Sequence, residues 1–154
     1  MSAGFIARIR FNEKISAPGA LHAGLWLFAY AAAPVALSAA LCLALFPAGL
    51  QRETGLFTWL VVSPVIETLM LGALLIHLLA RHKEQHALML AALVLAAFHS
   101  LNSVAWGCIA LPLFLVHGYA FTRLYERDRQ RAFVVPMLAH ALHNVLVLLV
   151  LELI

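Results

Sequence analysis

Residues 87–121 read ALMLAALVLAAFHSLNSVAWGCIALPLFLVHGYAF, an apolar stretch that is too long for a single helix across a lipid bilayer. Such a helix needs about 20 apolar residues. Polar residues and a glycine interrupt the stretch at Ser100 and again between Asn102 and Gly107, in a composition typical of turns. The sequence therefore predicts two helices joined by a tight turn near Asn102 to Gly107.

The composition of the whole chain excludes a water-soluble domain. Of the 154 residues, 64% are hydrophobic and only 11% are charged, whereas roughly a quarter of the residues of a soluble domain are charged. Three further apolar segments have the length of a membrane span, at residues 22–46, 56–80 and from 133 to the C-terminus. We therefore expect an all-α, polytopic membrane bundle of about five transmembrane helices, formed by a single domain over residues 1–154.

The positions of the basic residues predict the orientation of this bundle. The core of the domain is expected to cover residues 56–154. With five spans, one side of the membrane holds the N-terminal arm (1–21) and the loops at 81–86 and 122–132. Of the ten lysines and arginines, only Arg52 lies on the other side. Positive loops face the cytoplasm, so we expect a cytoplasmic N-terminus. The lipid bilayer is an expected partner and nucleic acid is not.

Four polar residues lie well inside the predicted spans. Glu67 is the only acidic residue there, and a carboxylate at the bilayer centre costs about 3 kcal/mol on insertion scales. His99 lies in the third span, while His140 and Asn144 lie one turn apart on one face of the fifth. At a rise of about 1.5 Å per residue, all four lie roughly 10–20 Å from the cytoplasmic ends of their helices, which indicates a functional site. Pro64 is expected to kink its helix and to open a water-accessible notch beside the carboxylate.

Three other histidines in apolar runs are predicted to be structural. His77 and His117 stand alone in their helices, and a single intramembrane histidine often serves only to hydrogen-bond to a neighbouring helix. His143 lies beside Asn144, and we expect it to support the site without a direct role.

A glutamate, two histidines and an asparagine support two kinds of chemistry. Glu67, His99, His140 and His143 have the donor atoms of a zinc site, which would make the protein a zinc-dependent intramembrane protease or a metal transporter. Without a metal, the carboxylate acts as general base on a water held by one histidine, while the second histidine and the asparagine donate hydrogen bonds to an oxyanion. Asn144 is a poor ligand for transition metals and a good oxyanion donor, which favours hydrolysis without a cofactor. A third interpretation is a non-catalytic membrane immunity or accessory protein.

Signatures of other intramembrane hydrolases do not occur in the sequence. It contains no HExxH motif of a zinc metalloprotease and no GxSxG motif of a serine hydrolase. Asp128, in a predicted loop, is the only aspartate, which excludes a pair of catalytic aspartates.

The segment around Glu67 resembles the first motif of the CPBP family. This family contains the type II CAAX prenyl endopeptidases, their bacteriocin-immunity relatives and other glutamic-type intramembrane proteases. Its motif, P-x-x-E-E-x-x-x-R-G, corresponds to PVIETLMLGA, in which Pro64 and Glu67 match. Thr68 replaces the second Glu, and Gly72 replaces the Arg.

The later motifs of the family follow in the same order. FxxxH appears as Leu95-x-x-x-His99, with Leu in place of Phe, and HxxxN is intact at His140 and Asn144. The resemblance covers about residues 59–149, which is most of the chain.

The resemblance implies an intramembrane endopeptidase that acts on a membrane-anchored protein or peptide. It implies that Glu67 and His99 activate the water and that His140 and Asn144 stabilise the oxyanion, without a cofactor. Because two residues of the first motif are replaced, the chain resembles a divergent, small bacterial branch more than the main CAAX branch. The resemblance therefore implies a multi-pass protein of the bacterial inner membrane. Some such members process C-terminal sorting tails of exported proteins, the JDVT-CTERM type among them, and this is the substrate class that the resemblance implies.

Overall fold

The chain folds into a bundle of α-helices. The computed structural model describes residues 11–15, 19–45 and 55–151, and within these ranges it contains helices and turns but no strand. A short helical segment at 11–15 precedes α2 (Ala20–Leu45), η1 (Thr58–Val62), α3 (Ser63–Leu79), α4 (Glu84–Ser100), α5 (Val104–Tyr125) and α6 (Arg129–Leu151). The predicted all-α fold is confirmed.

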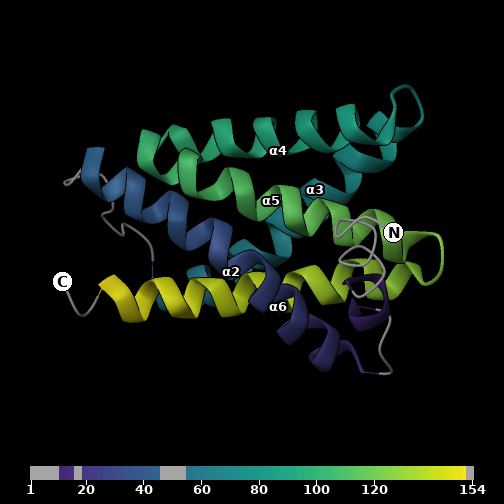
Figure 1. Cartoon of the computed structure of the whole chain (residues 1–154), viewed down its shortest axis with the longest axis horizontal. Coiled ribbons are helices and arrows are strands. Elements are labelled where there is room, and N and C mark those ends of the chain that lie inside the picture. The colour runs from purple at the N-terminus through teal and green to yellow at the C-terminus, as the bar shows by residue number, and fades with distance from the viewer. Residues whose placement is uncertain (1–10, 16–18, 46–54, 152–154) are drawn as a thin grey trace, which may run out of the picture.

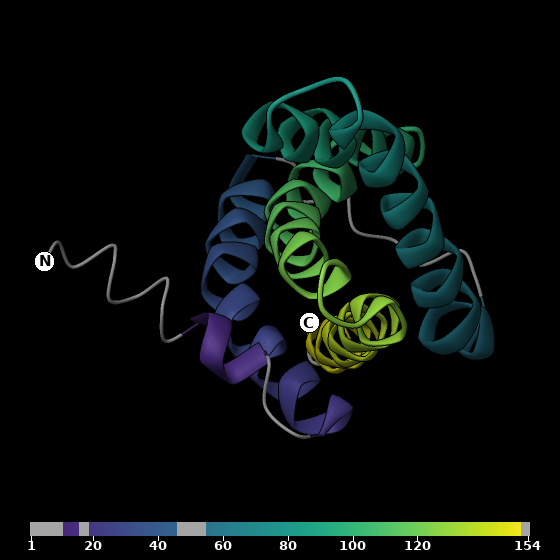
Figure 2. The ribbon, with the colours of Figure 1, turned by 90° about the vertical axis from the view of Figure 1, so that its right-hand side faces the viewer.

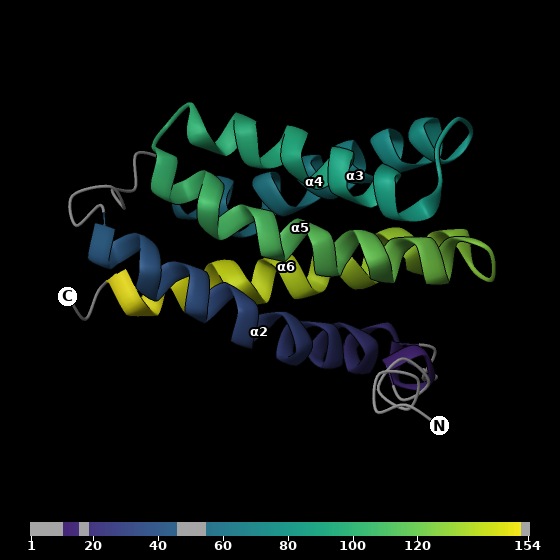
Figure 3. The same ribbon diagram turned by 45° about the horizontal axis from the view of Figure 1, so that its top comes forward.

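Among the described residues, four helical segments are long and apolar enough to cross a membrane: α2, η1 together with α3, α5 and α6. The remaining predicted span, α4, which is the third along the chain, has 17 residues, the lower limit of the range of about 17–25 for a crossing helix. α4 runs antiparallel to α5 along most of its length (Figures 1 and 3). The membrane bundle therefore has four helices of full spanning length and a shorter fifth.

α5 is the central helix of the bundle. Within the 18-residue apolar stretch of α5, 56% of the residues are buried inside the protein. The corresponding stretches of the other three spanning segments are 22% to 39% buried. α5 packs against α2, α3, α4 and α6, and Figure 2 shows these helices arranged around it. Polar side chains on the inner faces of α3, α4 and α6 are therefore held against α5 and away from lipid.

The α4–α5 hairpin is confirmed, but its turn is shorter than predicted. Residues 101–103 form the turn, and the Ser103 side chain caps α5 by accepting a hydrogen bond from the Ala105 N–H at 3.1 Å. Gly107, which we expected at the turn, lies inside α5. A Cβ atom there would lie 2.7 Å from the Ala96 carbonyl oxygen, so this glycine allows α4 and α5 to approach closely.

α6 begins earlier than predicted. The sequence suggested a start at Phe133, whereas the helix begins at Arg129. The cause is Asp128, whose Oδ1 accepts a hydrogen bond from the Arg131 N–H at 3.0 Å and so caps the first turn. Residues that were assigned to a charged loop are thus the first turn of a helix.

One end of the bundle carries the basic turns. The turns before α4 and before α6 lie at the right-hand end in Figure 1, together with the start of α2. Glu84 ties α4 to α5 at this end, because the Arg123 guanidinium donates to its two carboxylate oxygens at 2.6 and 2.8 Å. Arg8, Arg10 and Arg52, which contribute to the predicted charge asymmetry, lie outside the described residues.

Candidate active site

The helix that carries Glu67 begins with a π-helical turn. In η1 the Ser63 N–H donates to the Thr58 carbonyl, five residues earlier, instead of to the carbonyl four residues earlier as in an α-helix. The next residue, Pro64, has no N–H that could donate to the Trp59 carbonyl in the same register. The distortion predicted at Pro64 is therefore a π turn directly before α3, a feature that is frequent at functional sites.

Asn144 supplies the missing donor. Its Nδ2 donates to the Trp59 carbonyl oxygen at 2.7 Å, which joins α6 to the π turn. The sequence suggested Asn144 as an oxyanion donor. One of the two Nδ2 hydrogens serves the Trp59 carbonyl, and the second remains for the cavity that Asn144 also lines.

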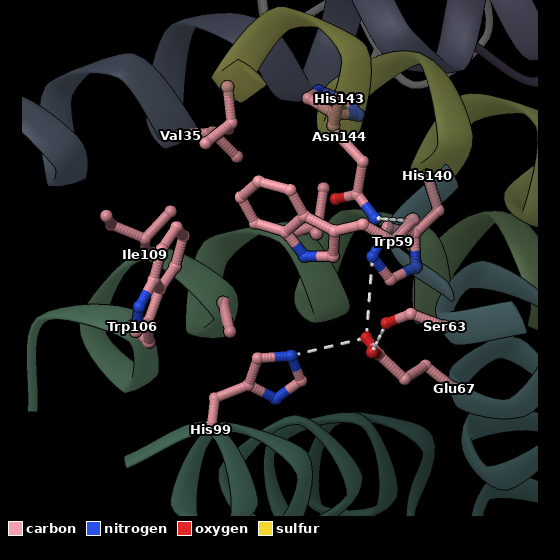
Figure 4. Close-up of a pocket in the computed structure, with 13 residues that line it drawn as sticks. Val35, Trp59, Ser63, Glu67, His99, Trp106, Ile109, His140, His143 and Asn144 are labelled. Carbon is pink, nitrogen blue, oxygen red and sulfur yellow. Dashed lines mark hydrogen bonds and ion pairs between the residues drawn. The ribbon is translucent and has the colours of Figure 1, made fainter. Parts of the chain in front are cut away.

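Glu67 is the centre of the polar cluster. Its Oε2 lies 3.3 Å from Nε2 of His99 and 3.4 Å from Nε2 of His140 (Figure 4). Its Oε1 accepts a hydrogen bond from the hydroxyl of Ser63, one turn earlier along the helix. Side chains from α3, α4 and α6 thus meet at one carboxylate, and the structure brings together three residues that the sequence placed at one depth.

A backbone contact fixes the orientation of the His99 ring. Its Nδ1 lies 2.9 Å from the Leu95 carbonyl oxygen, and because a carbonyl only accepts, Nδ1 carries a hydrogen. In the neutral ring, Nε2 is then the acceptor nitrogen and can accept a hydrogen from a water bound beside Glu67. The Phe114 ring of α5 lies edge-on to the His99 ring, with centroids 5.3 Å apart, and supports it from the side of the bundle core.

The cluster lines a small cavity (Figure 4). Its volume of about 50 Å³ gives room for a few water molecules. The apolar part of its wall includes Val35, Trp59, Trp106, Ile109, Leu113 and Val147. Glu67 is the only lining residue other than histidine that can carry a charge. A water in this cavity therefore lies beside one carboxylate in mostly apolar surroundings.

The exposure of the three side chains indicates where the cavity opens. The side chain of His99 is 25% exposed, that of Glu67 16% and that of His140 only 4%. The opening is therefore near His99 and α4, and His140 lies at the closed end.

The arrangement of the imidazoles also bears on the zinc alternative. Among the residues that the structure describes, no group of three or more His, Cys, Asp and Glu side chains is arranged to hold a metal ion. The Nδ1 of His143 is hydrogen-bonded to the Ala139 carbonyl at 2.8 Å.

Two residues near the site were missed from the sequence. Ser63 lies four residues before Glu67 on the same helix face, so its spacing could have indicated the contact. His117, which we expected to be structural, lies with its ring centroid 5.8 Å from that of His140. No sequence signal indicates this second contact, because it depends on how α5 packs against α6. His77 does not line the cavity, and its contact is with Arg81, four residues later in the chain, instead of with a neighbouring helix as we expected.

Comparison with known families places this site in context. Residues 52–146 match the family described as Type II CAAX prenyl endopeptidase Rce1-like. The chain belongs to this family. Searches of curated proteins and of solved structures gave no significant match. The Rce1-like region contains the whole predicted cluster, and membership identifies a multi-pass CAAX-type membrane protease that acts on membrane-anchored peptides or proteins.

Packing explains one departure of this Rce1-like chain from the first motif. Gly72 stands where the motif has Arg, and a Cβ atom there would lie 2.5 Å from the Phe133 ring and 2.9 Å from the Phe121 ring. The space in which an arginine side chain would begin is therefore filled by aromatic rings. Thr68, in place of the second Glu, is buried as well, with 3% of its surface exposed. Both replacements remove a charge from the bundle interior.

Proposed function

We propose that the protein is a glutamic-type intramembrane endopeptidase that needs no metal. The observation that carries the proposal is the convergence of the Nε2 atoms of His99 and His140 on Oε2 of Glu67, beside a cavity with room for a few water molecules. A carboxylate in such a site is suited to general base catalysis, because water exclusion strengthens its interaction with a bound water.

In the proposed reaction, Glu67 takes a proton from a water while Nε2 of His99 accepts the second hydrogen of that water and holds it in place. The oxygen of the water then forms a bond to the carbonyl carbon of the scissile peptide. The carboxyl of Glu67 returns the proton to the leaving nitrogen as the C–N bond breaks. The products are a carboxylic acid and an amine, so the reaction consumes one water and no other reactant.

His140 and Asn144 are proposed to stabilise the oxyanion of the tetrahedral intermediate. The Nε2 of His140 faces a carboxylate, which only accepts, so in the neutral ring this nitrogen carries a hydrogen. The second Nδ2 hydrogen of Asn144 is available on the same side of α6. Two donors of this kind stabilise a developing oxyanion far more in a site that excludes water than in bulk water.

The proposed substrates are proteins with a membrane-anchored C-terminal sorting tail. The apolar wall around Trp59 and Trp106 suits apolar side chains of a tail, and the indole rings lie edge to face with centroids 5.6 Å apart. We further propose that the protein lies in the bacterial cytoplasmic membrane with the basic end of the bundle in the cytoplasm, in agreement with the basic turns at that end.

The test is cleavage of a panel of tailed membrane substrates by the purified full chain in lipid vesicles. Glu67→Gln should lower the cleavage rate at least about 100-fold, because it removes the base while keeping the shape. Glu126→Gln, at an exposed carboxylate of the basic end, is the matched control and should cleave normally. Undiminished cleavage by Glu67→Gln refutes the proposal. Stoichiometric zinc in the active protein, or loss of activity on chelation, refutes the metal-free mechanism.

A further inference from the structure

Behind the catalytic cluster lies a second group of imidazoles. His117 of α5 and His143 of α6 both lie next to His140, and the His117 centroid is 5.8 Å from that of His140 and 5.6 Å from that of His143. The three residues are among the most deeply buried polar residues, with 1%, 3% and 2% of their surfaces exposed for His117, His140 and His143. The buried nitrogens of three neighbouring imidazoles must therefore find their hydrogen bonds from one another or from enclosed water.

The hydrogens on two of these rings follow from their partners. His143 has its Nδ1 hydrogen on the Ala139 carbonyl, so in the neutral ring its Nε2 can only accept. His140 has its Nε2 hydrogen toward Glu67, so its Nδ1 can only accept. Both of these acceptor nitrogens are buried and have no hydrogen-bond partner among the described residues. Two acceptors thus need a donor.

His117 is the neighbour that can provide one. Its Nε2 is also buried and without a hydrogen-bond partner in the described part of the chain. A ring nitrogen that carries hydrogen can donate to another imidazole directly or through one bridging water. With its hydrogen on Nε2, His117 offers one donor to two acceptor rings, those of His140 and His143, whose centroids are 5.8 and 5.6 Å away. Because none of the three nitrogens has a direct hydrogen-bond partner among the described residues, the link requires one bridging water.

The charge of Glu67 decides between the two acceptors. The Glu67 carboxylate, 3.4 Å from Nε2 of His140, polarises the ring and makes its other nitrogen a stronger acceptor. His143 donates only to a neutral carbonyl. We propose that His117 is a positioning residue: its Nε2–H donates through one bridging water to Nδ1 of His140 and so holds His140 in the tautomer that directs Nε2–H at Glu67 and at the oxyanion. Its catalytic consequence rests on the proposed peptidase function.

α5 supports this assignment through its spacing. Phe114, three residues before His117, lies edge-on to the His140 ring with centroids 5.8 Å apart, so α5 contacts this ring at two successive positions. One contact restricts where the ring lies and the other fixes which nitrogen carries the hydrogen. Without the donor, His140 is free to adopt the other tautomer, in which Nε2 presents a lone pair to the carboxylate and cannot serve the oxyanion.

The first test requires neither a variant nor a substrate. The full chain, labelled with ¹⁵N at its histidine rings and held in lipid nanodiscs, gives ring-nitrogen NMR shifts that report which nitrogen carries hydrogen. We expect His140 to be the Nε2–H tautomer with a hydrogen-bonded Nδ1, and His117 to carry hydrogen on Nε2. His140 with hydrogen on Nδ1, or His117 without hydrogen on Nε2, overturns the proposal.

The second test removes the donor. In His117→Leu, the ring shifts of His140 should change toward the Nδ1–H tautomer, and kcat should fall at least about tenfold with little change in KM. His117→Gln, which keeps an amide donor, should restore both, and His77→Leu, at a histidine away from the cluster, should change neither. If His117→Leu changes the ring-nitrogen shifts of His143 but not those of His140, His117 donates to His143 instead, and the proposal is wrong. The NMR measurement of the ring shifts does not depend on cleavage. A failure of the proposed peptidase function is detected separately, as undiminished cleavage by Glu67→Gln.

Discussion

The contact between Asn144 and the Trp59 carbonyl gives a prediction that depends on the π turn. Asn144→Leu keeps the approximate volume of the side chain and removes the amide that donates to this carbonyl. A buried carbonyl left without a donor costs about 1–3 kcal/mol in proteins, and intramembrane hydrogen bonds measure at the lower part of this range. We therefore expect Asn144→Leu to lower the free energy of unfolding by about 1–2 kcal/mol.

Pro64→Ala should remove most of this cost. Residue 64 then has an N–H that can donate to the Trp59 carbonyl, so the loss of the Asn144 amide leaves no unsatisfied group. A double-mutant cycle should show a coupling of about 1–2 kcal/mol between the two positions, which corresponds to a factor of roughly 5–30 in the folded-to-unfolded ratio.

The assay is reversible unfolding of the wild type, both single variants and the double variant by SDS titration in mixed micelles. Leu148→Ala, at another buried position of α6, is the control and should be additive with Pro64→Ala. If Asn144→Leu costs the same free energy with and without proline at residue 64, the proline does not leave the Trp59 carbonyl without a donor, and our account of the π turn is wrong.

Three further predictions follow from contacts described above. Gly72→Ala should lower stability by about 1–3 kcal/mol in the same titration, because its Cβ meets the Phe133 ring; an unchanged midpoint would mean that the ring moves aside freely. Ser63→Ala should lower kcat about 3- to 10-fold, because the hydroxyl holds the Glu67 carboxylate, and an equal change in KM alone would contradict this role. Glu84→Gln should lower stability by less than about 1 kcal/mol at low salt, since the pair is about one-third exposed, and a loss that persists in high salt would contradict an ionic origin.

Much of the site could be predicted because the surroundings are so apolar. A carboxylate such as Glu67 inside a span is costly unless it has polar partners, so its presence alone indicates a site. The helical repeat then places His140 and Asn144 on one face, and the depth of His99 in its helix follows from the rise per residue. The helical periodicity and the free-energy cost of burying a carboxylate in lipid therefore predict the depth in the membrane at which the polar residues meet.

The remaining features depend on how the helices pack and on local backbone register. The contact of His117 with His140 requires knowledge of which face of α5 meets α6. The partner of Asn144 depends on a π turn that shifts the hydrogen-bond register by one residue, which no hydrophobic pattern records. The early start of α6 follows from one side-chain cap at Asp128, which charge patterning alone assigned to a loop.

The aromatic packing at Gly72 also restricts how this sequence could have changed and could change again. An arginine at this position requires Phe133 or Phe121 to be smaller, and a smaller residue there leaves a cavity for as long as residue 72 is glycine. Either order of substitutions passes through a less stable protein, and the separate effects do not add. A protein with glycine at residue 72 and these two phenylalanines therefore cannot acquire the arginine of the family motif by one neutral step. Related proteins with glycine at this position should also have large aromatic residues at the positions of Phe121 and Phe133. The glycine together with the two aromatic residues can then serve to identify the branch of the family that lacks the arginine.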